Sequence, residues 1–341
     1  MTRPHRPALK MLPCLSATVP LFNLVFDSQK PSKPRVLVIG YGWAGKSFVD
    51  NLDHAKYNVK VISTTTRRLN QPKMIHSLRP EWTAANLPIV EDGLQRLDSL
   101  TNTVFCNRSR CEYDYLVLAL GGETNTYGIP GVAEHAYKFK TPEDVMALKA
   151  ALPAVSKVNI IGSGPTGIEL ACRLQDEGKF VSVTEATATI LPGFSEQIRQ
   201  KVTSILASRN IELRLNTKIT KVHPEPDTIT VWVAGIRQAP PIRTLTGNKP
   251  LTTDDQLRYF TNIYAIGDCV TGRGPPTAQN ARQQGEFLAR HFNSGLRSGN
   301  VYEYQEYGRI LDLNDHLLIE YRGFLIQVPA WCRHILYLIL G

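Results

Sequence analysis

Four short apolar runs stand out along this chain, and each one ends in glycine. They are Val36–Ile39, Tyr115–Leu120, Val158–Ile161 and Ile263–Ile266. Runs this short that are rich in Val, Ile and Leu, with no polar alternation, are typical of parallel strands covered on both faces. Patterns typical of helices follow several of them. The sequence therefore predicts an α/β protein, and its length of 341 residues suggests two domains.

Two of these strands run into the same glycine pattern, G-x-G-x-x-G. In this pattern the first glycine makes a tight turn, the second lets the backbone approach a pyrophosphate, and the third lets helix and strand pack closely. The anion then rests on the amides at the helix N-terminus. Two such loops predict two Rossmann-like dinucleotide-binding domains in one chain. The glycines are Gly40, Gly42 and Gly45 in the first loop and Gly162, Gly164 and Gly167 in the second.

The residue that ends the following strand differs between the two units. In the second unit Glu185 ends the strand, where its carboxylate would accept from a ribose 2′-hydroxyl and repel a 2′-phosphate, which predicts NADH rather than NADPH. Glu185 stands 18 residues after the third glycine of its loop, and in the first unit the residue 18 positions after Gly45 is Ser63. There Ser63, Thr64 or the backbone must hold an adenosine, and Arg67 or Arg68 could reach a phosphate. Two different units suggest two different dinucleotides, as in a flavin reductase.

The other two strand ends also place residues where ligands bind. Gly121 follows Tyr115–Leu120, and Asp268 follows Ile263–Ile266. Ligands of open α/β sheets bind at the carboxyl ends of the strands. Asp268 can accept from a hydroxyl of a flavin's ribityl chain, so we interpret it as a cofactor contact and no acid catalyst.

A polar helix is predicted after Pro276. Pro275 and Pro276 stiffen the turn, and Thr277 is placed to cap the helix N-terminus. Gln279 and Gln283 share one face, and neutral amides can donate to a carbonyl without charging the pocket, which suits a quinone head group. The alternative is a solvated polar face. The positive helix end would also stabilise an anionic reduced flavin.

Composition narrows the choice of partners. The net charge of +9 favours an anionic lipid surface, nucleic acid or an acidic partner, unless the excess lies in a basic leader and loops. No basic–aromatic repeat or nucleic-acid motif is present, so we expect no nucleic-acid partner. The six cysteines form no C-x-x-C pair, so we expect no metal site or redox dithiol of that type. Residues 1–34 are basic and acid-poor, as in a transit peptide or a plain disordered leader.

The C-terminal stretch GFLIQVPAWCRHILYLILG is apolar but interrupted, and too short to span a bilayer. We predict a helix lying in a membrane interface. Trp331, Ile335 and Leu338 would lie on one face, and Arg333 could reach lipid head groups. The alternative is a helix packed on the protein's own core or on a second subunit.

Residues from about 35 to 341 resemble the type II, non-proton-pumping NADH:quinone oxidoreductases. The likeness rests on GYGWAG, LALGGETNTYGIPGV with FKTPEDV, IIGSGPTGIEL with VTEA, NIYAIGDC and above all PPTAQNARQQG. It implies FAD in the first unit, NADH in the second, and hydride transfer to flavin followed by two electrons to ubiquinone or a similar quinone. It also implies a membrane-docking C-terminal segment and leaves a homodimer open.

The resemblance assigns roles to individual residues. Glu169 becomes a candidate for moving a proton near the flavin, although it could simply offset the macrodipole at its helix start. One segment departs from the family: RRLNQPKMI keeps Pro72 and lacks the usual aromatic residues. The flavin positions are Gly40, Gly42, Trp43, Gly45, Lys140 and Asp268; the NADH positions are Gly162, Gly164, Thr166, Gly167, Glu169 and Glu185; the quinone positions are Ala278, Gln279 and Gln283.

These inferences define a domain plan and two competing functions. We expect a leader over 1–34, an FAD domain over 35–150 plus 244–312, an inserted NADH domain over 151–243, and a membrane-associated helical segment over 313–341. The leader and the family together suggest a peripheral protein of the mitochondrial inner membrane, and the alternative is the cytoplasmic face of a membrane. The alternatives are a soluble reductase for another acceptor, similar to ferredoxin reductases or apoptosis-inducing factor, and a non-catalytic basic flavoprotein.

Overall fold

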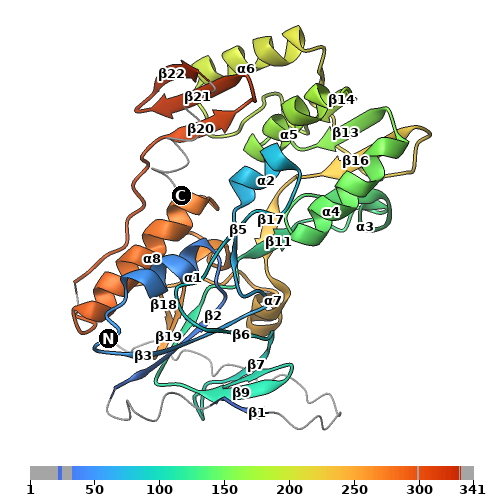
Figure 1. Ribbon diagram of the computed structural model, residues 1–341. Coiled ribbons are helices and arrows are strands. Elements are labelled where there is room, and N and C mark those ends of the chain that lie inside the picture. The colour runs from blue at the N-terminus through green and yellow to red at the C-terminus, as the bar shows by residue number, and fades with distance from the viewer. Residues whose placement is uncertain (1–21, 25–32, 298, 330, 332–341) are drawn as a thin grey trace, which may run out of the picture. The chain divides into compact units, whose positions relative to one another are not determined.

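The computed structural model describes residues 22–24, 33–297, 299–329 and 331, which form two compact α/β units (Figure 1). Unit 1 takes in the described residues of Met1–Arg68, Trp82–Glu123 and Arg237–Gln305. Unit 2 takes in those of Leu69–Glu81, Thr124–Ile236 and Glu306–Gly341. Two short strand pairs lie where the chain passes between units: β4 (Arg68–Leu69) with β5 (Trp82–Thr83), and β11 (Gly122–Thr124) with β17 (Ile236–Gln238).

Unit 1 is built on a six-stranded sheet with the order β18-β19-β10-β2-β3-β6. All neighbouring pairs are parallel except β18 with β19. The strands are β2 (Arg35–Ile39), β3 (Asn58–Ser63), β6 (Ile89–Glu91), β10 (Tyr115–Leu118), β18 (Arg258–Phe260) and β19 (Ile263–Ala265). The register pairs Leu118 with both Ile39 and Ala265, so the carboxyl ends of these strands meet at one edge. The predicted strands of this unit are confirmed, with ends shifted by one or two residues.

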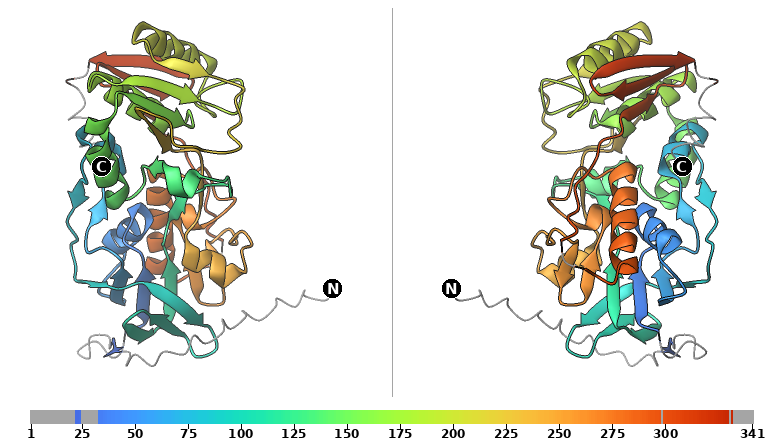
Figure 2. Two further views of the ribbon diagram at one scale, coloured as in Figure 1. Left: turned by 90° about the vertical axis from the view of Figure 1, so that its right-hand side faces the viewer. Right: turned by 90° about the vertical axis from the view of Figure 1, so that its left-hand side faces the viewer.

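Helices α1 (Trp43–Asn51) and α8 (Ala278–Asn293) lie side by side in unit 1 (Figure 2). Their backbones touch at Gly285, where a Cβ would lie 2.5 Å from the Ala44 carbonyl oxygen. Phe48 and Phe292 meet edge to face, with ring centroids 5.4 Å apart. The predicted cap of α8 is confirmed, because Thr277 Oγ1 accepts from the Asn280 amide at 3.2 Å.

A second, smaller sheet in unit 1 has the order β1-β9-β8-β7. Its strands are β1 (Phe22–Asn23), β7 (Leu94–Asp98), β8 (Thr103–Cys106) and β9 (Ser109–Glu112), and helix α7 (Pro240–Thr246) lies nearby. Burial raises the pKa of the Cys106 thiol to about 12 and that of the Cys111 thiol to about 11. Both thiols are free and buried.

Unit 2 has a five-stranded parallel sheet with the order β12-β16-β13-β14-β15. The strands are β12 (Ala136–Lys138), β13 (Lys157–Ile161), β14 (Phe180–Thr184), β15 (Glu212–Arg214) and β16 (Thr228–Trp232). The helices are α2 (Gln71–Ser77), α3 (Val132–His135), α4 (Pro142–Ala151), α5 (Pro165–Asp176) and α6 (Glu196–Ser208). The predicted strand Val158–Ile161 is confirmed as the core of β13.

The C-terminal segment corrects the prediction of a helical region from residue 313. The described residues form an antiparallel sheet of β20 (Arg309–Asp312), β21 (His316–Tyr321) and β22 (Phe324–Pro329). Arg322 and Gly323 both adopt positive φ, at 51° and 82°, which matches the two-residue turns that join twisted strands. Periodicity alone missed this turn in an apolar stretch. Most of the proposed interface helix, residues 332–341, lies outside the described residues.

The two units also divide the chain differently from the predicted domain plan. Residues 124–150 fall in unit 2 because β12 pairs with β16, and α4 packs against β12. Residues 69–81 join unit 2 because α2 packs on α5. Residues 306–312 do so through β20, which also contacts α5. No helix within the described part of the chain has the length and hydropathy needed to cross a bilayer.

Candidate functional site

The first glycine loop has the shape that an anion-binding loop needs. Gly40 has φ +104°, and a Cβ there would lie 2.3 Å from the Ala119 carbonyl oxygen. A Cβ on Gly45 would lie 2.1 Å from the Gly40 oxygen, so helix α1 can approach the turn only without a side chain. Gly42 is different, because nothing lies within 4 Å of its added Cβ. The loop therefore leaves open space in front of the first amides of α1.

The second loop repeats this geometry in unit 2. Gly162 has φ +111°, and a Cβ on Gly167 would lie 2.0 Å from the Gly162 oxygen. Gly164 again faces open space and directly precedes α5, whose second residue is Thr166. Both loops thus combine a turn, a close helix–strand contact and an exposed helix N-terminus. This arrangement suits a pyrophosphate on backbone amides.

Glu185 stands directly after β14 and is bonded to the second glycine loop. Its Oε2 accepts from the Ser163 amide at 3.1 Å and from Ser163 Oγ at 2.7 Å, and its Oε1 accepts from the Thr187 amide at 3.0 Å. Burial alone would raise its pKa, but the bonds from Ser163 and Thr187 outweigh this, and the pKa lies below its ordinary value. The site therefore holds a fixed negative charge beside the loop.

The matching position of unit 1 holds no acid. Ser63 ends β3, and its hydroxyl accepts only weakly from the Thr65 amide, at 3.4 Å. Close by, the Arg68 guanidinium stacks 3.7 Å from the centre of the Trp43 ring, at the first residue of α1. Arg68 is 4% exposed, donates to Thr83 Oγ1 at 3.1 Å, and has no hydrogen-bond partner at Nε within the described structure.

An unpaired buried donor costs about 1–3 kcal/mol, so this position favours a ligand that brings an acceptor. A dinucleotide phosphate or ribose oxygen is such a group. Arg67 is exposed and Arg68 is buried, and the role of either residue in binding a phosphate stays a prediction.

The other predicted strand-end residues of unit 1 meet at the same edge of its sheet. Gly121 follows β10 with φ +70°, and Asp268 lies in the 3₁₀ turn η2 (Gly267–Cys269), directly after β19. Asp268 is partly exposed, and Ala278 is the first residue of α8. Lys140, predicted on the flavin side, lies in unit 2, where its amide donates to Asp144 Oδ2 at 3.0 Å.

Gln279 and Gln283, whose side-chain amides were predicted to bind a quinone, each make hydrogen bonds within the chain. Gln279 Oε1 accepts from the Tyr304 hydroxyl at 2.7 Å. Gln283 bonds the backbone of Gln305 twice, donating to its oxygen at 2.7 Å and accepting from its amide at 3.0 Å. Both side chains thus hold the segment that follows α8. Their quinone role stays a prediction.

Gln284 is a functional candidate that the sequence reasoning missed. It is 1% exposed, and its Oε1 accepts from the Gly267 amide at 2.7 Å. Its Nε2 donates to the Arg273 oxygen at 3.0 Å. Gln284 therefore fixes the turn that carries Asp268. The QQG run contains this signal, because Gln284 follows Gln283 there, but the prediction rested on the helix face that Gln279 and Gln283 share.

Glu169 lies on the second turn of α5 in unit 2. Its Oε1 accepts from the Asp312 amide at 3.0 Å. Burial raises its pKa to about 8; the bond from the Asp312 amide opposes this shift, and the Asp312 charge adds to it. A carboxyl that titrates near neutral pH can both hold and release a proton.

Comparison with known proteins places this arrangement in a class. The family model described as pyridine nucleotide-disulphide oxidoreductase matches residues 34–285. The chain belongs to this family.

Two relatives with similar sequences are named as ubiquinone oxidoreductases. A protein of Schizosaccharomyces pombe named a probable mitochondrial NADH-ubiquinone oxidoreductase is 26% identical over 345 residues, covering 77% of this chain and 63% of its own. An Arabidopsis thaliana protein named a mitochondrial external alternative NAD(P)H-ubiquinone oxidoreductase is 28% identical, covering 70% of this chain and 54% of its own. The chain thus spans somewhat over half the length of these relatives.

Among solved structures, that of NDH2 from Plasmodium falciparum in complex with NADH shares the fold. It superimposes with a TM-score of 0.79 at 18% identity, covering 90% of this chain and 94% of its own. The likeness supports the two-unit α/β architecture.

Proposed function

We propose that this chain is an FAD-dependent oxidoreductase that takes a hydride from NADH and passes two electrons to a membrane quinone, without pumping protons. The observation that carries the proposal is the pair of equally shaped glycine loops with different strand-end residues. One unit holds a fixed carboxylate and the other a buried arginine. The relatives named NADH- or NAD(P)H-ubiquinone oxidoreductases support the choice of reaction.

Unit 2 binds NADH. The open face at Gly164 receives the pyrophosphate on the first amides of α5, with Thr166 beside it. Glu185 accepts from the ribose hydroxyls, and its negative charge disfavours a 2′-phosphate. Because Ser163 also bonds Glu185, the loop and the acid are held in one geometry before the nucleotide arrives.

Unit 1 binds FAD, and its residues fit that group. Gly42 leaves space at the N-terminus of α1, and Arg68 has an unpaired donor next to Trp43. Gly121 and Asp268 lie at the same sheet edge and hold the ribityl chain. FAD, when bound, supplies the chemistry that converts hydride transfer into electron transfer.

The start of α8 faces the acceptor. Ala278 and Gln279 lie in its first turn, where the amides give the helix its positive end. Gln279 and Gln283 are the proposed amide contacts of the quinone, and each must exchange or share its present partner to make them. Glu169 supplies or accepts the proton in this scheme, because its raised pKa lets it keep one near neutral pH.

The cellular setting is also part of the proposal. We place the protein at the mitochondrial inner membrane, peripherally, with ubiquinone as acceptor. The two relatives are named as mitochondrial proteins that act with ubiquinone. The C-terminal segment is the proposed membrane contact: its last described strand carries exposed Phe324 and Ile326, and Trp331 beyond it is 73% exposed. A homodimer stays an expectation.

The main alternative is a soluble reductase for another acceptor, which the fold alone does not distinguish. The deciding experiment mixes purified, flavin-loaded protein anaerobically with NADH and follows the flavin absorbance. The absorbance should bleach with NADH and recover when a short-chain ubiquinone is added. If it recovers with a ferredoxin and not with quinone, the alternative holds.

A further inference from the structure

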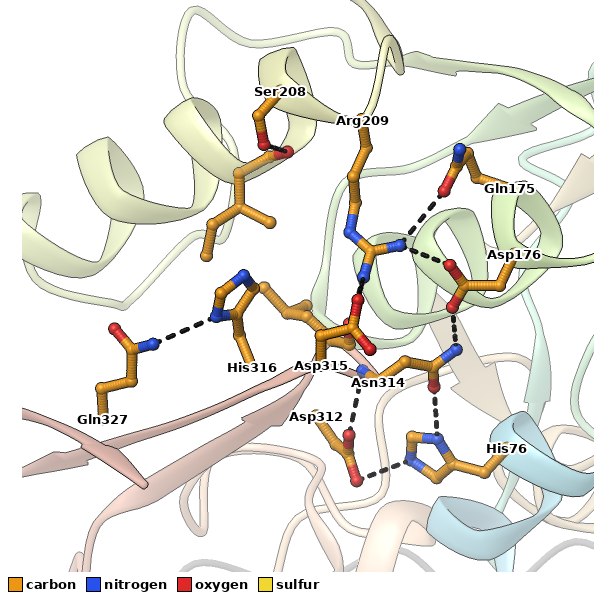
Figure 3. Close-up of polar contacts among 12 residues, drawn as sticks. His76, Gln175, Asp176, Ser208, Arg209, Asp312, Asn314, Asp315, His316 and Gln327 are labelled. Atoms are coloured by element: carbon orange, nitrogen blue, oxygen red, sulfur yellow. Dashed lines mark hydrogen bonds and ion pairs between the residues drawn. The ribbon is translucent and has the colours of Figure 1, made fainter. Parts of the chain in front are cut away.

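A chain of polar groups joins α2 to the end of β20 in unit 2 (Figure 3). His76 Nε2 lies 3.2 Å from Asp312 Oδ2, and His76 Nδ1 lies 3.1 Å from Asn314 Oδ1. Asp312 Oδ1 accepts from the Asn314 amide at 3.1 Å. The Asp312 side chain is 1% exposed and that of His76 is 15% exposed. The imidazole thus connects a buried carboxylate to the surface.

The partners of Asn314 define the protons on the ring. Its Nδ2 donates to Asp176, so its Oδ1 is the atom that faces His76 Nδ1. The other ring nitrogen faces the Asp312 carboxylate. A proton on Nδ1 can be donated to Asn314 Oδ1, whereas Nε2 meets Asp312 at ion-pair distance without an aligned hydrogen bond. When Nε2 also carries a proton, His76 is an imidazolium that pairs with the Asp312 carboxylate.

Arg209 fixes this segment from the other side. It donates to Asp176 Oδ1 at 2.6 Å, to Asp315 Oδ2 at 2.7 Å and to the Leu313 oxygen at 3.3 Å (Figure 3). The residues on both sides of Asn314 are therefore held in place. A change of charge at His76 cannot be absorbed by movement of this turn alone.

Asp312 also touches the proposed proton-carrying residue. Its amide donates to Glu169 Oε1, and its negative charge favours the protonated form of Glu169. The elements packed on α5 bring few other charges. The titratable or charged groups are Lys73 and His76 on α2, Arg309 and Asp312 on β20, Lys157 on β13, and Cys172, Arg173 and Asp176 on α5 itself; β14 carries none.

We propose that His76 and Asp312 are positioning residues that control whether Glu169 keeps its proton. With its proton, the imidazolium of His76 offsets the charge of Asp312, and Glu169 releases its proton more readily. When His76 loses that proton, the full charge of Asp312 acts on Glu169 and holds its proton in place. The pair makes proton release from Glu169 depend on a surface-accessible group.

The consequence for turnover rests on the proposed function. Reduction of a quinone by NADH consumes one proton from solvent, as NADH + H⁺ + quinone → NAD⁺ + quinol. Glu169 can deliver that proton only if it is protonated before the step and can release it during the step. The His76–Asp312 pair tunes this balance without touching either substrate.

Infrared titration of the flavin-loaded protein tests the proposal without an activity assay. The carbonyl band of protonated Glu169, assigned by subtracting the Glu169→Gln spectrum, is followed between pH 6 and pH 10. We expect His76→Gln to raise the midpoint by about one pH unit and Asp312→Asn to lower it by about one. In the Asp312→Asn background, His76→Gln should cause no further shift. His316→Gln is the matched control, because that ring bonds Gln327 instead, and its midpoint should equal the wild type.

The two single variants separate an electrostatic role from damage to the fold. Damage to the fold would move the Glu169 midpoint in the same direction in His76→Gln and Asp312→Asn. Shifts in the same direction, or no shift in either variant, would overturn the proposal. His76→Lys, which keeps a positive charge, should restore the wild-type midpoint even where His76→Gln is poorly folded. Absence of quinone reduction by the wild type would refute the proposed function and leave this titration result standing.

Discussion

The two glycine loops have nearly the same backbone and differently occupied surroundings. In both loops the first glycine has φ above 100°. A Cβ added to the third glycine would lie about 2 Å from the carbonyl oxygen of the first. In unit 2 Glu185 comes directly after the strand that follows, whereas in unit 1 that strand ends in Ser63. In the proposed function, the shared loop geometry receives the pyrophosphate and the residue at the neighbouring strand end selects the nucleotide.

The surroundings differ in a second way. Unit 1 brings the ends of β10 and β19 and the capped helix α8 to the edge where its loop lies. Unit 2 adds to its loop a carboxylate that is already bonded to Ser163. A cofactor that stays bound benefits from many fixed contacts, whereas a substrate that leaves after each turnover needs few. If the proposed function holds, one loop design serves both a resident and an exchanging nucleotide.

The strongest test of the shared geometry adds one methyl group to the third glycine. Gly45→Ala and Gly167→Ala force a Cβ against a backbone oxygen at 2.1 Å and 2.0 Å. Each should lose about 3 kcal/mol of unfolding free energy by overpacking, and Gly45→Ala should lose its flavin as well. Urea denaturation and the ratio of flavin to protein absorbance measure both effects.

The second glycines provide matched controls, because their Cβ would meet no atom. Gly42→Ala and Gly164→Ala should keep the stability of the nucleotide-free protein and weaken only the binding of FAD or NADH. If Gly45→Ala proved as stable as Gly42→Ala, the assigned close contact would be wrong.

Glu169 and Glu185, which both lie in unit 2, should respond to pH in opposite ways. Glu169 has a folded pKa of about 8, above its unfolded value of 4.5, so the stability it contributes is present below pH 4.5 and lost as pH rises toward 8. Glu185 has a lowered pKa, so its contribution is present above its unfolded value and lost as pH falls through the folded one.

Glu169→Gln should therefore gain on the order of 4 kcal/mol over the wild type between pH 5 and pH 9. Chemical denaturation at both pH values gives the difference. Glu185→Gln should show no such gain at high pH. Identical pH profiles for wild type and Glu169→Gln would contradict the assignment.

Gln284→Leu tests the buried glutamine of unit 1 that holds the turn carrying Asp268. The substitution removes the acceptor of the Gly267 amide and leaves that buried donor unpaired, which costs about 2 kcal/mol. Because the same turn carries Asp268, flavin should be lost on dilution about tenfold more easily, as measured by equilibrium dialysis. Gln283→Leu, on the partly exposed neighbour, should change stability by less than about 1 kcal/mol. Equal effects of the two substitutions would remove Gln284 from the flavin site.

The sequence was sufficient for four central strands and the two glycine loops because their signals are local. Val36–Ile39 and Val158–Ile161 are apolar enough to mark buried strands, and the glycine spacing imposes the turn that follows. The N-cap at Thr277 was likewise readable from adjacent residues. Membership of 124–150 in unit 2 was not readable, because it depends on the long-range pairing of β12 with β16.

Other features escaped because their meaning depends on partners distant in the chain. His76 acquires a role only when Asp312 is placed beside it, and Gln284 only when Gly267 is. The C-terminal hairpin escaped for a different reason: an apolar stretch of that length fits a helix or two strands, and only the positive φ values at Arg322 and Gly323 decide between them.

The smallest expected change in free energy comes from Glu185→Ala, which directly tests the difference between Glu185 in unit 2 and Ser63 in unit 1. Glu185→Ala removes the acceptors for the ribose hydroxyls and frees Ser163. Loss of charge-assisted hydrogen bonds worth about 1.5–2 kcal/mol should raise the KM for NADH roughly 10- to 30-fold with little change in kcat. The same variant should use NADPH better relative to NADH, because the repulsion of a 2′-phosphate is gone. Ser63→Ala, at the same offset in unit 1, should leave both KM values unchanged. If Ser63→Ala shifted the KM for NADH and Glu185→Ala did not, the assignment of the two nucleotides to the two units would have to be reversed.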